Sequence, residues 1–189
     1  MLSAPSSASD VISKLFLAPP QSSVNILSFY DSDKVKNQLN FTAVIRDQTI
    51  GTVKSPLEFT IKLNNDDSYL QIIFEQPSKN QLTMRMIGID VDDHGTPMTA
   101  VQNKKTKKIS LLNPPTRKKS KGLPNKAFNL ASTSYMKVAI TGLQNRAIKI
   151  DIKIGEQIEM YLVDVNFGIN RVDIAHLSGE LNLFNFTYE

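Results

Sequence analysis

The chain has 189 residues with an ordinary globular composition, 41% hydrophobic and 21% charged, which suits one large domain with a buried core. It contains no cysteine, which excludes disulfides and cysteine-bound metals, and no apolar run approaches the roughly 18 residues of a transmembrane helix. Behind a net charge of +4, residues 94–150 hold twelve basic side chains and no acidic one. Charge segregated in this way predicts a surface for a polyanion or an acidic membrane, the alternative being a solvated loop.

The N-terminal stretch predicts a short helix. Residues 1–8 are small and polar and are expected to be disordered, without the basic and apolar regions of a signal peptide. Over residues 8–17, Ser7 and Asp10 fit a capping box, apolar side chains form one face, and two prolines follow. A helix of about ten residues is marginal alone, so we expect it to pack on the core, a neighbouring subunit or a membrane.

After the helix, the pattern changes to the alternation of β-strands. Residues 56–63 (PLEFTIKL) and 147–155 (AIKIDIKIG) alternate apolar and polar side chains almost without exception. Weaker alternation covers residues 24–30, 40–50, 69–75, 81–91, 136–143, 157–166 and 172–187. Turn signals such as NNDD separate these runs. The sequence therefore predicts a single β-rich domain over residues 9–189, either all-β or β-rich α+β, with the strands in an antiparallel sandwich or barrel.

One long connection interrupts this pattern. Residues 95–134 show little periodicity and are broken by glycines and prolines, which predicts a loop insertion of functional importance or without fixed structure. Within it, residues 103–122 carry eight of the chain's 22 lysines and arginines. These eight are the candidate binding residues: Lys104, Lys105, Lys107, Lys108, Arg117, Lys118, Lys119 and Lys121.

The composition of this lysine-rich segment indicates what it binds. Lysine outnumbers arginine and no aromatic side chain interleaves the cluster, which favours salt-dependent contact with phosphates over the reading of bases. The expected partner is a nucleic acid or nucleocapsid, or an anionic membrane in which Ile109, Leu111 and Leu112 dip among the headgroups. The two basic clusters also resemble a bipartite nuclear-localisation signal, which implies a nuclear import receptor as a partner.

No constellation in the sequence predicts catalysis. Residues 90–95 (DVDDHG) begin like a calcium loop, but Val101 stands where the bidentate glutamate is needed, so a hairpin turn is the better interpretation. His176 has no metal-site or triad partner that the sequence identifies. There is no phosphate-binding loop, dinucleotide fingerprint or nucleophile elbow. We therefore expect no enzyme activity, no cofactor and no metal.

A small basic chain with a short N-terminal helix, a β core and one lysine-rich loop resembles the matrix proteins of enveloped negative-strand RNA viruses. The resemblance covers overall organisation and implies a structural protein that self-assembles, located in the virion and in the host cytoplasm or nucleus. Jelly-roll coat proteins of small plant RNA viruses are a second resemblance, through the closing run HLSGELNLFNFTYE. A cellular or phage nucleic-acid-binding accessory protein, intracellular and not secreted, is the remaining alternative.

Overall fold

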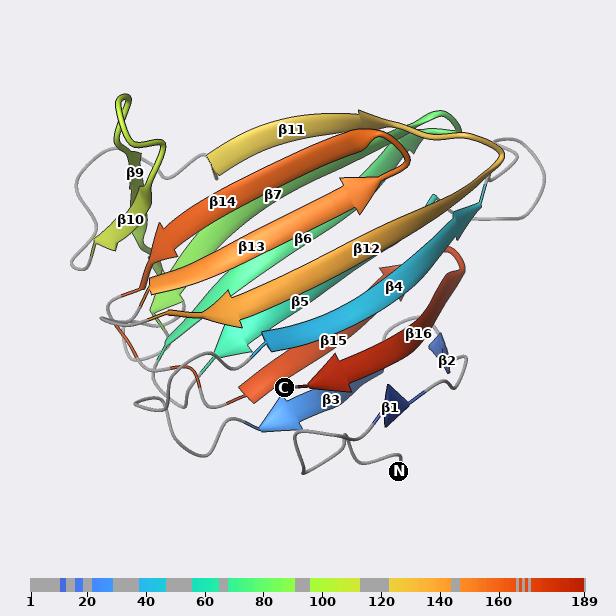
Figure 1. Cartoon of the computed structure of the whole chain (residues 1–189), viewed down its shortest axis with the longest axis horizontal. Coiled ribbons are helices and arrows are strands. Elements are labelled where there is room, and N and C mark those ends of the chain that lie inside the picture. Colours follow the sequence, from blue (N-terminus) through green and yellow to red (C-terminus); the bar gives the residue numbers. More distant parts are fainter. Residues whose placement is uncertain are drawn as a thin grey trace.

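Two stacked β-sheets make up the described part of the chain. The structure is a computed structural model that describes residues 11–12, 16–18, 22–28, 38–46, 56–64, 68–90, 96–112, 123–143, 147–165, 167, 169 and 171–188. Every regular element in these residues is a strand, and the strands are numbered β1 to β16 along the chain (Figure 1). The prediction of a β-rich antiparallel sandwich or barrel is confirmed, and among the alternatives the described residues form an all-β sandwich.

The first sheet, called sheet A, has nine strands in the described residues. In spatial order they are β1 (Val11–Ile12), β16 (Leu181–Tyr188), β4 (Gln38–Arg46), β12 (Thr133–Gly142), β13 (Ala147–Ile154), β14 (Gln157–Asp164), β10 (Ile109–Leu112) and β9 (Thr99–Gln102), and β2 (Phe16–Ala18) also pairs with β16. All pairs are antiparallel except β10 with β14, which run parallel. The parallel pair joins the short β9–β10 hairpin to the edge of the main sheet.

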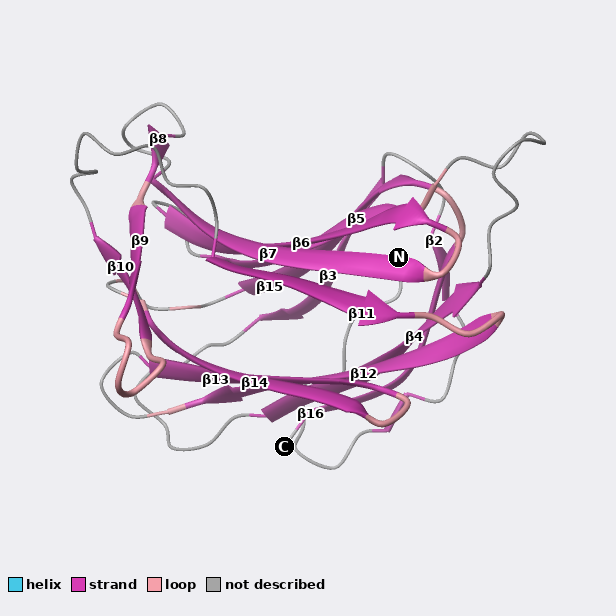
Figure 2. Ribbon diagram, turned by 90° about the horizontal axis from the view of Figure 1, so that it is seen from above, coloured by secondary structure: helices cyan, strands magenta, loops and turns pink. Residues whose placement is uncertain are grey.

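The second sheet, called sheet B, has seven strands in the described residues, and all its pairs are antiparallel. In spatial order they are β11 (Leu123–Asn129), β7 (Gln81–Asp90), β6 (Ser68–Ser78), β5 (Glu58–Asn64), β15 (Arg171–Ser178) and β3 (Ser22–Ser28), and β8 (Thr96–Pro97) pairs with β7. Figure 2 shows the two sheets one above the other, with the β9–β10 hairpin upright at one side between them.

The apolar side chains of both sheets meet in one core. On β13 the four isoleucines are at most 5% exposed, whereas Asp151 and the two lysines between them face outward. In sheet B, Phe59 and Phe74 are fully buried and stack with their ring centroids 4.8 Å apart. Burying one such side chain contributes roughly 1.5–3 kcal/mol, so the alternation in the sequence decides which face of each strand turns inward.

The helix predicted over residues 8–17 does not form where this stretch is described. Val11–Ile12 and Phe16–Ala18 are strands β1 and β2, both paired with β16, and the rest of the stretch, like residues 1–8, lies outside the described residues. A ten-residue helix is marginal by itself, whereas the edge of β16 supplies backbone partners for the same residues. The helix prediction is wrong for the residues in β1 and β2.

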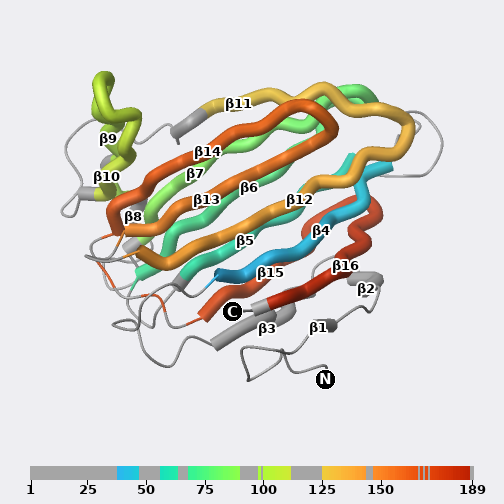
Figure 3. The backbone as a smooth tube through the Cα atoms, viewed as in Figure 1, coloured from blue at the N-terminus to red at the C-terminus, as the bar shows by residue number. Residues whose placement is uncertain are grey.

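The connection between β7 and β12, predicted as a loop insertion over residues 95–134, contains the strands β8 to β11. Figure 3 shows the chain leaving sheet B after β7, forming the β9–β10 hairpin at the edge of sheet A, and returning to sheet B as β11. Strands β8, β9 and β10 have two to four residues, which is too few to show a period, and the pairing of β11 shifts register between Leu123 and Lys126. Residues 113–122 lie outside the described residues.

Candidate functional site

The lysine-rich segment begins in the turn of the β9–β10 hairpin. Four of the predicted binding residues occupy or flank this turn, which projects at one end of the molecule in Figure 1: Lys104, Lys105, Lys107 and Lys108. The other four lie outside the described residues: Arg117, Lys118, Lys119 and Lys121. The structure therefore brings half of the predicted set together on one short turn.

Asn103 fixes the backbone of this turn. Its Oδ1 accepts hydrogen bonds from the backbone N–H groups of Lys105 (2.9 Å) and Thr106 (3.1 Å), as in an Asx turn. Its own N–H donates to the carbonyl of Lys108 at 2.9 Å, and its carbonyl accepts from the N–H of Lys107 at 2.8 Å. Lys107 closes the turn in the left-handed region, with φ 60°. The lysine side chains therefore extend from a defined backbone.

Three of the four lysines carry a charge that no described carboxylate neutralises. Lys104, Lys105 and Lys107 are exposed, and none of them forms an ion pair with a described residue. Lys108 differs, because its Nζ lies 2.8 Å from Oδ2 of Asp164 on β14. Lys108 thus ties the turn to sheet A, whereas the other three ammonium groups face solvent.

The hairpin that carries the turn is rooted in the core. Ile109 and Leu111 of β10 are only 1% and 3% exposed. Leu111 packs so closely on β7 that a Cβ added to Gly88 would lie 2.9 Å from its Cδ1, and the N–H of Met98 donates to the carbonyl of Gly88 at 2.7 Å. The prediction that Ile109 and Leu111 dip into a membrane is wrong, because both side chains are buried in this core.

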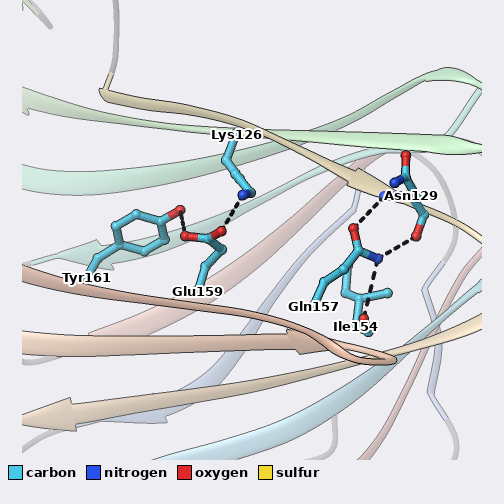
Figure 4. Close-up of polar contacts among 6 residues, drawn as sticks. All are labelled: Lys126, Asn129, Ile154, Gln157, Glu159 and Tyr161. Carbon is cyan, nitrogen blue, oxygen red and sulfur yellow. Dashed lines mark hydrogen bonds and ion pairs between the residues drawn. The ribbon is translucent and has the colours of Figure 1, made fainter.

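At the other end of the lysine-rich segment, β11 is tied to β14 across the two sheets (Figure 4). Lys126 on β11 forms an ion pair with Glu159 on β14, and the hydroxyl of Tyr161 donates to the same carboxylate at 3.4 Å. The side chain of Gln157 accepts from the N–H of Asn129 and donates to its carbonyl, both at 2.8 Å. Since β10 pairs directly with β14, the strands on both sides of residues 113–122 are attached to β14.

The environment of Tyr161 shows that this inter-sheet contact is partly buried. Burial raises the pKa of the Tyr161 hydroxyl well above its ordinary value of 10, and the charge of Glu159 and the hydrogen bond to it raise the pKa further. Because of this raised pKa, the hydroxyl keeps its proton, and with it the hydrogen bond to Glu159, to a higher pH than an exposed tyrosine would. This hydrogen bond lies within β14, and the carboxylate that it contacts is the one that Lys126 reaches from β11 in the other sheet.

The other candidates from the sequence form no reactive arrangement in the described residues. Of the DVDDHG run, residues 91–95 lie outside the description, and the strands on either side of them pair, with Ile89 opposite Pro97. His176 is 1% exposed, and its Nε2 lies 2.9 Å from the carbonyl of Ser178, which is the setting of a structural histidine. Within the description there is no cluster of potential metal ligands and no helix long and apolar enough to cross a membrane.

Sequence reasoning missed the acidic residues that organise this site. Asp164 holds Lys108, and Glu159 holds Lys126, although each acid lies far along the chain from its lysine. Both acids belong to a run whose strand character the alternation predicts, but only the pairing of β14 with β10 and its position opposite β11 bring them to the lysines. The sequence alone does not give this strand order, and without it the two acids could not be assigned to their lysines.

No family model matches the chain, and no curated protein matches it. Similar solved structures include the CBM2 module of the evolved Dit of Lactobacillus casei BL23 phage J-1, with 9% identity and a TM-score of 0.49 over 92% of this chain and 74% of that one. The Bacteroides ovatus xyloglucan PUL GH43B has 8% identity and a TM-score of 0.47 over 82% of this chain and 27% of that one. The Botulinum neurotoxin serotype G binding domain has 13% identity and a TM-score of 0.46 over 96% of this chain and 42% of that one. Likenesses this distant carry no conclusion about function.

Proposed function

We propose that this β-sandwich is a non-enzymatic protein that binds a polyanion through its lysine-rich segment. The observation that carries the proposal is the β9–β10 turn, where Lys104, Lys105 and Lys107 present three exposed ammonium groups without a described counter-ion. Because the hydrogen bonds of Asn103 fix the backbone beneath them, less backbone freedom is lost on binding. A cationic turn of this kind suits a repeating anionic surface.

A nucleic acid, free or in a nucleocapsid, fits this turn better than a membrane does. Lysine ammonium groups act as compact point charges for phosphates, and the described turn offers no aromatic ring on which a base could stack. Membrane binding would gain from apolar side chains beside the lysines, but Ile109 and Leu111 are buried. We therefore assign the turn to the phosphate backbone, with little dependence on base sequence.

The test is the salt dependence of binding to a nucleic-acid duplex. Each phosphate contact contributes about −0.9 to the log–log slope, so replacing Lys104, Lys105 and Lys107 together by Gln should flatten the slope by about 2.7. Lys108→Gln is the matched control in the same hairpin, since Asp164 already neutralises that charge, and it should change the slope little.

Two outcomes of this test would contradict the proposal. In the first, the triple variant keeps the wild-type slope, which would mean that the turn does not contact phosphates. In the second, vesicles containing anionic lipid bind more tightly than the duplex at equal salt, and the membrane would then be the partner. Unchanged far-ultraviolet circular dichroism would show that the variants keep the sandwich.

An assembly role, as expected from the resemblance to viral matrix and coat proteins, stays a prediction. Strand β9 lies at one end of the strand order of sheet A, and such an edge can pair with another chain. Val101 on this strand is 46% exposed, which adds an apolar contact at that edge. Light scattering of the protein at rising concentration should reveal oligomers, and a strict monomer at low salt would contradict the matrix and coat interpretations.

A further inference from the structure

Two lysines face each other on the outer side of sheet A, away from the β9–β10 turn. Lys137 on β12 and Lys153 on β13 are direct cross-strand partners, and both side chains are exposed. Like charges in directly opposite positions repel one another. The register of β12 and β13 places the two lysines opposite each other, and solvation of the sheet face gives no reason for two like charges at these positions.

A third lysine on this face, Lys149, has its charge neutralised by a carboxylate. Lys149 lies on the same face of β13, and its Nζ is 3.0 Å from Oδ2 of Asp151. No described carboxylate makes an equivalent contact with Lys137 or Lys153. Within the described part of the chain, Lys137 and Lys153 therefore form no ion pair, whereas Lys149 beside them does.

The surface around this pair is hollowed on both sides. One hollow, of about 600 Å³, has Tyr135, Asn129 and Gly155 in its lining, and a second, of about 340 Å³, is lined in part by Asn40 and Ile158. Both hollows also include Lys137 and Lys153, so the two cations lie where they adjoin. Each hollow has one carboxylate in its lining as well, Glu156 in the first and Asp151 in the second, and Asp151 is paired with Lys149. A Cβ added to Gly155 would meet no atom within 4 Å, which leaves the space beside the pair open.

We propose that Lys137 and Lys153 form a binding site for one phosphate group carried by a small molecule. A phosphate with two negative charges relieves the repulsion between the ammonium groups, and its oxygens accept charge-assisted hydrogen bonds from both. The exposed ring of Tyr135 lies two residues from Lys137 on the same face, so an aromatic phosphate monoester gains a stacking surface as well.

This site is separate from the polyanion-binding turn. Lys153 pairs with Ile158 near the start of β14, whereas the turn is tied to Asp164 at the end of that strand. Figure 1 shows the turn and the β13–β14 connection at opposite ends of β14. The ligand is therefore a single phosphate group held by two cations, and its binding does not depend on the proposed function of the turn.

Nuclear magnetic resonance titration with inorganic phosphate, methyl phosphate and phenyl phosphate, at constant ionic strength, tests the site. Phosphate should shift the side-chain signals of Lys137 and Lys153, and phenyl phosphate should bind more tightly than methyl phosphate, because the ring of Tyr135 offers a stacking surface. Lys137→Gln or Lys153→Gln should weaken binding about tenfold or more, because one of two charge-assisted contacts is lost.

Two control variants separate this site from a general effect of charge. Lys149→Gln combined with Asp151→Asn removes the neighbouring ion pair from the same strand face without leaving a free carboxylate, so this double variant should change phosphate affinity by less than about twofold. The triple substitution of Lys104, Lys105 and Lys107 should not change it either. Equal weakening by this double variant and by Lys153→Gln would overturn the proposal, and so would the absence of any shift in the two lysine signals.

Thermal stability gives an independent test, because Lys137→Gln should have opposite effects on stability without phosphate and on the stabilisation that phosphate brings. In chloride at low ionic strength, Lys137→Gln should be at least as stable as the wild type, because the repulsion across the strands is gone. Added phosphate should raise the melting temperature of the wild type, since it binds the folded state, and should raise that of the variant less, because the variant binds phosphate more weakly. An equal rise in both proteins would contradict the site.

Discussion

Lys108 and Asp164 join the lysine-rich turn to sheet A through an ion pair of 2.8 Å between Nζ and Oδ2. The pair spans the start of the parallel β10–β14 pairing diagonally, because Lys108 directly precedes Ile109 and Asp164 directly follows Val163, the register partner of Ile109. It therefore separates the four described lysines into one that positions the hairpin and three that remain available to a ligand. The two roles can be tested apart.

Breaking this ion pair should loosen the hairpin slightly and leave the core intact. Both side chains are about one third to two fifths exposed, so solvent screens the interaction and its loss should cost no more than about 0.5–1 kcal/mol of unfolding free energy. Asp164→Asn should show this loss in urea unfolding, and amide exchange should speed up in β9 and β10 ahead of β13. Exchange that speeds up equally in all strands would show that the pair does not act locally.

The same variant should strengthen polyanion binding. Asp164→Asn removes the carboxylate that neutralises Lys108 and so adds a fourth available ammonium group to the turn. The log–log salt slope for duplex binding should steepen by about 0.9. An unchanged slope in Asp164→Asn, together with a flatter slope in the triple lysine variant, would indicate that Lys108 points away from the ligand.

Lys107 should limit the stability of the turn through its backbone rather than its charge. Its φ of 60° is a conformation that costs non-glycine residues roughly 1–2 kcal/mol, and glycine adopts it freely. Lys107→Gly should therefore be more stable than Lys107→Gln by about 0.5–1 kcal/mol, after allowance for the greater freedom of glycine in the unfolded chain. Both variants lose the charge, so their difference in urea unfolding isolates the conformation. Equal stability would show that the turn is not strained.

The sequence predicts those parts of the fold that depend on neighbouring residues in the chain, and it does not predict those that depend on contacts between distant residues. The strands β5 and β13 follow from the alternation of their own residues, because burial of one face decides their orientation. The strands β9 and β10 did not, since four residues show no period and their pairing with β14 depends on contacts distant in the chain. The fold class was therefore predictable, whereas the structure of the lysine-rich segment was only partly so.

In the candidate site, too, the properties of single residues could be predicted from the sequence, whereas the pairings between distant residues could not. Composition alone marked Lys104, Lys105 and Lys107 as cationic and exposed, and the structure agrees for these residues. Composition did not show that Asp164 neutralises Lys108, because that pairing depends on strand order. The opposition of Lys137 and Lys153 is likewise a matter of register, which a shift of one residue would abolish.

The hydroxyl of Tyr161 should make stability fall with rising pH above 10. Its pKa is raised in the folded protein, first by burial and then by Glu159, so the folded state keeps a proton that the unfolded chain releases from pH 10 upward. The stabilisation is fully present below the unfolded pKa and is lost as pH rises through the folded one. Urea unfolding between pH 8 and 11 should show a steeper decline in the wild type than in Tyr161→Phe.

Two further variants identify the source of that decline. Burial raises the pKa of Tyr69 as well, so Tyr161→Phe should keep part of the pH dependence and Tyr69→Phe should remove another part. Glu159→Gln removes the charge but not the burial, and it should reduce the contribution of Tyr161 without abolishing it. Parallel curves for the wild type and Tyr161→Phe would contradict the assignment.

Gly179 should tolerate no side chain, because the chain crosses there from β15 in sheet B to β16 in sheet A. Its φ is +80°, and an added Cβ would lie 2.6 Å from the Cα of Leu57, a backbone atom that cannot move aside as a side chain can. The hydroxyl of Ser178 donates to the carbonyl of Pro56 at 2.6 Å, so the two segments are held together at this point. Gly179→Ala therefore combines backbone strain with a clash.

The loss of unfolding free energy in Gly179→Ala should be about 2–4 kcal/mol, and the matched control is Gly155→Ala. Gly155 has a similar φ of +57° but no atom within 4 Å of an added Cβ, so only the strain of roughly 1 kcal/mol should remain. Urea unfolding of the two variants measures the difference, which is the cost of pushing Leu57 away from the crossing. Equal losses would show that the segment before β5 moves freely and does not hold the crossing between the sheets in place.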